Sequence, residues 1–181
     1  MNASQTPEQW KRRGEKLYQD KEYLEAEDAF IHAADGFRMA GDELLAAEMD
    51  NNRSVAFLQA GKPELALQAV NHTPDIFARA GDLRRQALAL GNQAASLEAL
   101  KRFSEAVEKY TEASEILKQI GDNESRATVL RSLSVLQMGQ GNRLDSLLSM
   151  HIGLQQVERP TMKQRLLKKL LEIPFNIMDR R

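Results

Sequence analysis

Cysteine is absent from the sequence. Its absence excludes disulfide bonds, zinc sites built on thiolates and a cysteine nucleophile, and it is compatible with a reducing, intracellular compartment. The sequence also lacks a run of about 18 apolar residues, the length needed to cross a bilayer. Its first residues lack the apolar core of a secretory signal. The sequence therefore predicts a cytoplasmic protein.

An excess of charge of one sign is missing as well. The 181 residues include 25 Lys and Arg and 26 Asp and Glu, a net charge of −1, which does not indicate a nucleic-acid partner. The charge is uneven: residues 161–181 carry six Lys or Arg and two acids, a net +4, which leaves −5 for residues 1–160. With 42% hydrophobic and 28% charged residues, the chain reads as a folded domain or a short repeat array.

Motifs that carry catalytic chemistry are missing too. The sequence has no glycine-rich phosphate loop, no H-E-x-x-H and no G-x-S-x-G. His32 and His72 are 40 residues apart, but no acid at metal-binding spacing accompanies them, so we expect a solvated ridge. A solvated helix face is also expected for the acidic row Glu105, Glu108, Glu112 and Glu115. We expect no enzyme, no catalytic residue, no metal and no cofactor.

What the sequence does contain is a dipeptide that returns every 40 residues. Gly-Asp stands at 41–42, 81–82 and 121–122. Glycines stand halfway between, at 61 and 141, and the remaining slot holds Lys101. A glycine adopts the left-handed conformation that ends a helix with little steric strain, and an Asp beside it caps the next helix. The pattern therefore predicts pairs of helices of nearly equal length.

The apolar residues between these marks have helical spacing. Residues 103–117 are apolar at i, i+3, i+4 and i+7, and no segment alternates with a period of two. The sequence therefore predicts an all-α chain, and its helical pairs are expected at residues 7–40, 43–80, 83–120 and 123–157. Pro74 falls inside the second pair, where we expect a kink or break near Asn71 to Thr73, because proline removes a helical hydrogen bond.

The first pair carries a motif that resembles a known repeat. Its positions are Trp10, Gly14, Leu17, Ala26, Phe30 and Ala33, with Arg13 in place of the usual Leu. This motif resembles the tetratricopeptide repeat (TPR), and its small-large-small order returns after shifts of 40 residues. The period of 40, longer than the usual period of about 34, is similar to the repeats of kinesin light chain and spindle-orientation adaptors. The resemblance implies a right-handed α-α superhelix, a TPR-like solenoid of four helical hairpins over residues 1–160.

In the TPR family the first helix of each pair lines a concave groove, and the resemblance implies which positions face it. These peptide-binding candidates are Lys11, Arg12, Glu15, Tyr18, Asn51, Asn52, Val55, Gln59, Asn92, Ala95, Glu98, Arg131 and Val135. An Asn amide both donates and accepts, so Asn52 and Asn92 would pair with the backbone of an extended peptide, and Arg131 would add a carboxylate contact. The alternative is that the two amides satisfy the backbone or each other.

Residues 161–181 differ from the array. Projected as a helix, residues 162–173 place apolar side chains on one half of the circumference and charged ones on the other. An open array needs its last apolar face covered, so we interpret 161–181 as an amphipathic capping helix and basic tail. The less favoured alternative is contact with an anionic membrane or a partner groove. The segment "IPFNIM" is expected to add apolar bulk after the helix.

These features predict a protein–protein interaction scaffold. Its concave groove would bind a peptide or helical segment of a partner protein, and rigid helices would mean that binding orders only the ligand. Two alternatives stay open. One is a self-associating structural protein, a homo-oligomer that uses the apolar half of residues 162–173. The other is a peripheral membrane adaptor that uses the basic tail.

Overall fold

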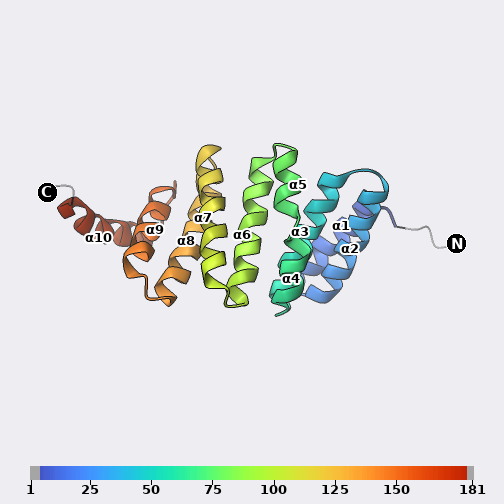
Figure 1. The fold of residues 1–181 in the computed structure, drawn as a ribbon, viewed down its shortest axis with the longest axis horizontal. Helices are drawn as coiled ribbons and strands as arrows, with labels where there is room; N and C mark the ends of the chain where they lie inside the picture. Colours follow the sequence, from blue (N-terminus) through green and yellow to red (C-terminus); the bar gives the residue numbers. More distant parts are fainter. Residues whose placement is uncertain (1–4, 179–181) are drawn as a thin grey trace. The chain divides into compact units, whose positions relative to one another are not determined.

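The described chain is entirely helical. The computed structural model describes residues 5–178, with side chains described as far as Leu171, and this part contains no strand. The helices are α1 (Pro7–Gln19), α2 (Tyr23–Met39), α3 (Glu43–Gln59), α4 (Pro63–Val70), α5 (Thr73–Arg79), α6 (Leu83–Ala99), α7 (Phe103–Gln119), α8 (Asn123–Gly139), α9 (Arg143–Gln155) and α10 (Met162–Met178) (Figure 1). Within the units, consecutive helices pack against each other, so the predicted α-α solenoid is confirmed.

The helices gather into two compact units. The first ends at Ala106 and the second begins at Val107, so that α7 crosses the division. Each unit is described by itself below. The predicted division into an array over residues 1–160 and a tail over 161–181 stays a prediction.

A left-handed residue closes a helix every 20 positions. Gly41, Gly61, Gly81, Gly121 and Gly141 all have φ between +72° and +79°, and Lys21 and Lys101 occupy the other two slots with φ of 64° and 61°. After the turn, the side chains of Asp42, Asp82 and Asp122 accept hydrogen bonds from backbone N–H groups three residues on, at 2.9, 2.9 and 3.0 Å. The predicted stop-and-start role of Gly-Asp is confirmed.

The two lysines in these slots adopt a conformation that suits glycine. We expect Lys21→Gly to raise the free energy of unfolding by about 1 kcal/mol, because the left-handed region crowds a Cβ atom. The reverse change, Gly61→Lys, is the matched control and should lower it by a similar amount, since a Cβ at position 61 would have open space and meet only backbone strain. Urea denaturation followed by Trp10 fluorescence measures both. A destabilised Lys21→Gly would contradict this explanation of the turn.

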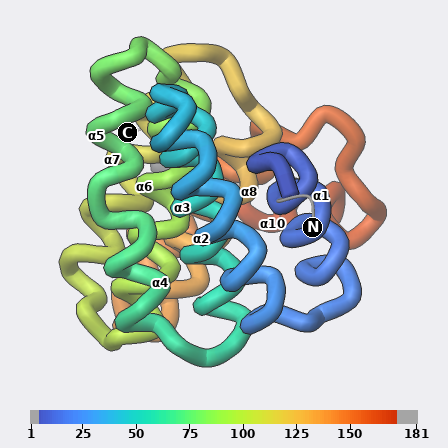
Figure 2. Tube along the Cα trace, turned by 90° about the vertical axis from the view of Figure 1, so that its right-hand side faces the viewer, coloured from blue at the N-terminus to red at the C-terminus, as the bar shows by residue number. Residues whose placement is uncertain are grey.

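The core of the first unit is built on α2, which packs against both α1 and α3 (Figure 2). Phe30 and Phe37 are buried among small residues, chiefly alanines such as Ala26 and Ala33. Alanines let neighbouring helices approach closely, and the phenyl rings fill the space between them. Across the α1–α2 contact, Gly14 lies against the Phe30 ring so closely that an added Cβ would be 2.7 Å from two ring carbons. The predicted small-large-small order is thus confirmed in the first pair.

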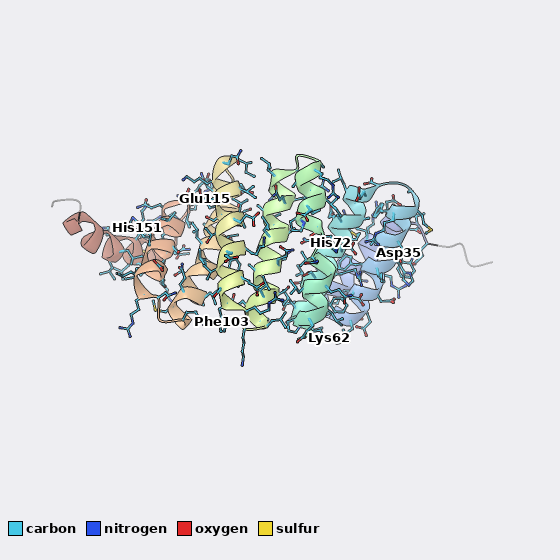
Figure 3. The ribbon with its side chains drawn as sticks, in the orientation of Figure 1. Asp35, Lys62, His72, Phe103, Glu115 and His151 are labelled. Carbon is cyan, nitrogen blue, oxygen red and sulfur yellow. The ribbon has the colours of Figure 1, made fainter. Side chains whose placement is uncertain are left out.

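The predicted break at Pro74 is confirmed. Helix α4 ends at Val70 and α5 begins at Thr73 with a proline in its first turn, so the pair has three helices; His72, labelled in Figure 3, lies at this break. The break frees backbone carbonyls, and two of them find partners. The Thr73 hydroxyl donates to the carbonyl of Val70 at 3.1 Å, and the buried side chain of Gln93 on α6 donates to the carbonyl of Asn71 at 2.9 Å.

In the second unit, buried serines hold α8 against α9. The Ser134 hydroxyl donates to the carbonyl of Ser146 at 2.9 Å, and the Ser146 hydroxyl donates to the carbonyl of Ser134 at 2.8 Å. One turn further, the Ser149 hydroxyl donates to the side-chain oxygen of Gln137 at 2.8 Å. Ser134 and Ser146 occupy small positions of the repeat, and the hydroxyls of all three serines are satisfied.

Ser54 stands 80 residues before Ser134 but has no such pairing. Its side chain is fully buried, and among the described residues its hydroxyl has no hydrogen-bond partner. We expect Ser54→Ala to raise the free energy of unfolding by about 1 kcal/mol, because it removes an unsatisfied polar group. Ser134→Ala, the matched control, should lower it by about 1 kcal/mol. Thermal denaturation by far-UV circular dichroism measures both, and equal effects of the two changes would contradict this account.

The last helix differs from the expectation in two respects. First, α10 continues through Pro174 to Met178, so the prediction that "IPFNIM" follows the helix was wrong. A proline removes one helical hydrogen bond and kinks a helix, but it does not always end the helix. Second, α10 packs against α9, but its apolar half is only partly covered, because Leu171 is 6% exposed and Met162 is 83% exposed. None of the described helices is both long and apolar enough to span a bilayer.

Candidate protein-binding face of the first unit

Three helices of the first unit carry most of the predicted site: α1, α3 and α6. Each is the first helix of its pair, and α3 and α6 pack against each other. A salt bridge joins α1 to α3, with Nζ of Lys11 2.6 Å from Oε1 of Glu48. The second oxygen of Glu48 lies 3.2 Å from Nη1 of Arg85 on α6. These helices therefore share one row of paired charges, which we call the charged row.

The charged row changes the role expected for Lys11. Its ammonium group is paired with Glu48, and both side chains are only about a quarter exposed. Arg85 was not a predicted site residue, and it also pairs with Asp82 at 2.7 Å. Glu48 was missed as well. The signal that could have found it is its spacing, because Glu48 is 37 residues from Lys11 and 37 residues from Arg85.

The asparagines form a second link between α3 and α6. The Asn92 amide donates to the side-chain oxygen of Asn51 at 3.0 Å, and both residues are half-buried. The alternative that two asparagine amides bond to each other is therefore confirmed in part. Asn92 pairs with Asn51, whereas the alternative named Asn52 as its partner. Among the described residues, the side-chain amide of Asn52 has no hydrogen-bond partner.

Asn52 instead faces a hollow between α1 and α3, which we call the α1–α3 hollow. It has a volume of about 290 Å³, and its lining residues are Glu15, Tyr18, Gln19, Phe30, Asn52 and Val55. Successive turns of α1 supply the first three, α3 supplies the last two at i and i+3, and Phe30 comes from α2. The structure thus brings four of the predicted residues together. Gln19 and Phe30 were missed as site residues, although Phe30 was recognised as a large position of the repeat.

The chemistry of the α1–α3 hollow is amphipathic. Phe30 and Val55 are apolar, and Asn52 offers a donor and an acceptor. Burial, and next the neighbouring Tyr23, raises the pKa of the Tyr18 phenol above its usual value. The phenol can donate a hydrogen bond. Glu15 is exposed at the rim and adds a negative charge. Such a hollow suits one apolar side chain of a ligand together with its polar backbone.

Another charged cluster lies between α2 and α3, and its members engage one another. The carboxylate of Asp50 contacts Arg38 and lies 3.2 Å from Nη1 of Arg53, while Nη2 of Arg53 lies 2.9 Å from Oε1 of Glu27. Burial raises the pKa of Asp50 above its usual value, although Arg38 and Arg53 oppose this shift. Because these charges pair internally, we interpret the cluster as a tie between two helices.

The other predicted site residues lie outside the hollow. Arg12 and Gln59 are exposed, while Ala95 and Glu98 are half-buried on α6. Arg131 and the 63% exposed Val135 belong to the second unit, where Arg131 lines a cleft of about 640 Å³ beside the segment from α9 to α10. That cleft carries charges of both signs. A groove shared by all the predicted residues stays a prediction.

His32, His72 and the acidic row lie at the surface. The imidazole ring of His32 stacks on Trp10 with a centroid distance of 4.6 Å, and His72 is exposed. Glu105, Glu108, Glu112 and Glu115 are all exposed, so the predicted solvated face is confirmed. Within the part of the chain that the structure describes, no three His, Cys, Asp or Glu residues come together in a group that could hold a metal ion.

Comparison with known proteins agrees with the helical-repeat character of the chain. The family model of the soluble NSF attachment protein, SNAP, matches residues 2–168. No match was found among curated proteins. SNAP proteins are helical-repeat adaptors that bind other proteins and are not enzymes. The specific resemblance to the longer repeats of kinesin light chain stays a prediction. With its paired helices, its face of first helices and a match over most of its length, the chain belongs to the SNAP family.

Proposed function

We propose that the protein is an adaptor that holds a segment of a partner protein on the face of α1, α3 and α6, with the α1–α3 hollow as the anchoring point. One observation carries the proposal. The hollow gathers Glu15 and Tyr18 from one helical pair and Asn52 and Val55 from the next. Residues in equivalent helices therefore meet at one place, as a peptide-binding repeat protein requires.

The chemistry of the hollow favours a protein segment over a cofactor. A volume of about 290 Å³ lies just below the range of small-molecule sites, roughly 300–1,000 Å³. An apolar side chain of the ligand would lie against Phe30 and Val55. The free amide of Asn52 would pair with the ligand backbone, and the Tyr18 phenol would donate to a carbonyl. Glu15 favours a cationic residue nearby in the ligand.

The links beside the hollow supply preorganisation. The charged row and the bond between Asn51 and Asn92 join neighbouring helices. Helices held in this way lose little freedom when a ligand binds, which lowers the cost of association. The side chains that already pair with one another would therefore hold α1, α3 and α6 in place, while Asn52 and Val55 contact the ligand. A cytoplasmic location remains a prediction.

The name of the family makes NSF the first partner to test. We expect purified NSF to bind the immobilised full chain, and Val55→Glu to weaken that binding at least about tenfold, because it places a charge in an apolar contact. Asn52→Ala should weaken it less. The matched control is Gln68→Glu on the exposed side of α4, which should leave the affinity unchanged. Circular dichroism checks that the variants fold, and unchanged affinity for both hollow variants would overturn the proposal.

A further inference from the structure

The apolar half of α10 is mostly uncovered. Met162 is 83% exposed, Leu166 62% and Leu170 55%, whereas Leu171 is buried. The helix packs against α9. Because Met162, Leu166 and Leu170 are four residues apart, they form one continuous stripe along the helix, which we call the α10 stripe. Exposed apolar residues in such a row mark a contact surface.

Cations border the α10 stripe on both sides. At about 100° per residue, Lys163 lies next to Leu170 around the helix, and Lys169 lies next to Met162 on the opposite border. Arg165 is one step further round. All three cations are exposed, and the sequence of α10 has four cations and one acid, Glu172. The stripe therefore presents apolar side chains in the middle and positive charge at both edges.

This arrangement matches an anionic lipid surface better than it matches a second copy of the chain. In a two-fold pairing of two α10 helices, the same cations would face one another, and like charges repel. At a bilayer, the apolar stripe enters the acyl boundary, while the flexible stems of lysine and arginine carry their charges up to the anionic headgroups. None of the described helices can span a membrane, so such a helix lies in the plane of the interface.

We propose that α10 binds the surface of anionic membranes through the α10 stripe and its flanking cations. This site belongs to the second unit, whereas the α1–α3 hollow belongs to the first. The protein would thereby carry its bound partner to a lipid surface.

The test is co-sedimentation of the full chain with vesicles of phosphatidylcholine alone or mixed with phosphatidylserine. We expect binding to the mixed vesicles only, with a loss of affinity as salt is added. The double variant Leu166→Glu/Leu170→Glu should lower vesicle affinity at least about tenfold. Both leucines are exposed, so the fold should survive. The pair Lys163→Glu/Lys169→Glu should weaken binding to a similar extent.

Two matched controls accompany these variants. Leu144→Glu changes a leucine of α9 that is 82% exposed, and Lys62→Glu changes an exposed cation of the first unit; both should bind vesicles like the unchanged chain. Absence of binding at low salt, or equal binding by Leu166→Glu/Leu170→Glu, overturns the proposal. So does a dimer, seen by light scattering, that the same double variant dissociates, because it assigns the stripe to a second copy. Val55→Glu should keep vesicle binding, which separates this test from that of the hollow.

Discussion

Phe30→Ala is expected to lower the free energy of unfolding of the first unit by about 3–5 kcal/mol. The ring is 2% exposed and lies between α1 and α2, among alanines that cannot move in to fill the space. The loss combines the removed apolar contact with the cost of the remaining cavity. Trp10 is the single tryptophan of the chain and packs on the same core, so its fluorescence during urea denaturation reports on this unit.

The control for Phe30→Ala is Leu24→Ala on the same helix. Leu24 is 45% exposed, and its truncation should change the free energy of unfolding by no more than about 0.5 kcal/mol. A loss below about 1 kcal/mol for Phe30→Ala would show that the ring is not the filler of this contact, contrary to the structure.

Gly14→Val is expected to lower the free energy of unfolding by about 3 kcal/mol. A Cβ at this position would come within 2.7 Å of two ring carbons of Phe30, and the ring is itself enclosed by the core. Either the ring leaves its rotamer or α1 moves away from α2. Both displacements cost packing energy, and they reshape the α1–α3 hollow, which Phe30 lines. The same tryptophan fluorescence measurement applies.

Two further variants isolate the cause of this effect. Lys16→Val places valine at an exposed position of α1 and should cost only the helix-propensity difference, about 0.5 kcal/mol. The double variant Gly14→Val/Phe30→Ala should lose less than the sum of its single changes, because the ring that meets the valine is gone. Additive losses would place the cost of Gly14→Val elsewhere than at Phe30.

Helix positions were predictable because turn chemistry is local. A left-handed residue depends on its own backbone, and an Asp cap depends on the next three residues, so Gly81 and Asp82 predict a turn without knowledge of the rest of the fold. Lys21 escaped notice as a turn residue because lysine gives no signal of a positive φ. Pro74 was informative for the same local reason, but the partner of the freed Asn71 carbonyl, Gln93, could be found only in three dimensions.

Contacts between helical pairs were harder to predict. The repeat makes positions 40 apart equivalent, and this suggested that Asn52 and Asn92 belong together. In the structure, the linked residues are 41 apart for Asn51 and Asn92, and 37 apart for Lys11 and Glu48. Each helix contacts the preceding pair with one side and the following pair with another. Residues in contact therefore do not occupy equivalent positions of the repeat. The offset depends on how the helices pack, which the local sequence does not encode.

The tail shows a similar limit. The helical spacing of its apolar residues predicted an amphipathic helix, and α10 is present. Which part of an apolar half is covered depends on how the helix lies on its neighbour. Leu171 is buried and Leu170 is exposed, although the two residues are neighbours in the sequence and differ by only about 100° around the helix. Amphipathicity alone therefore could not distinguish a cap from a contact surface.

The central claim is that a partner segment lies on the face of α1, α3 and α6, at the α1–α3 hollow. The most direct measurement is to place a photo-crosslinking amino acid at Val55 of the full chain, with a matched chain labelled at Gln68, and to identify adducts formed in an extract of the host cells by mass spectrometry. The account predicts a partner adduct from position 55 and none from position 68. A partner captured from position 68 and not from position 55 would contradict it.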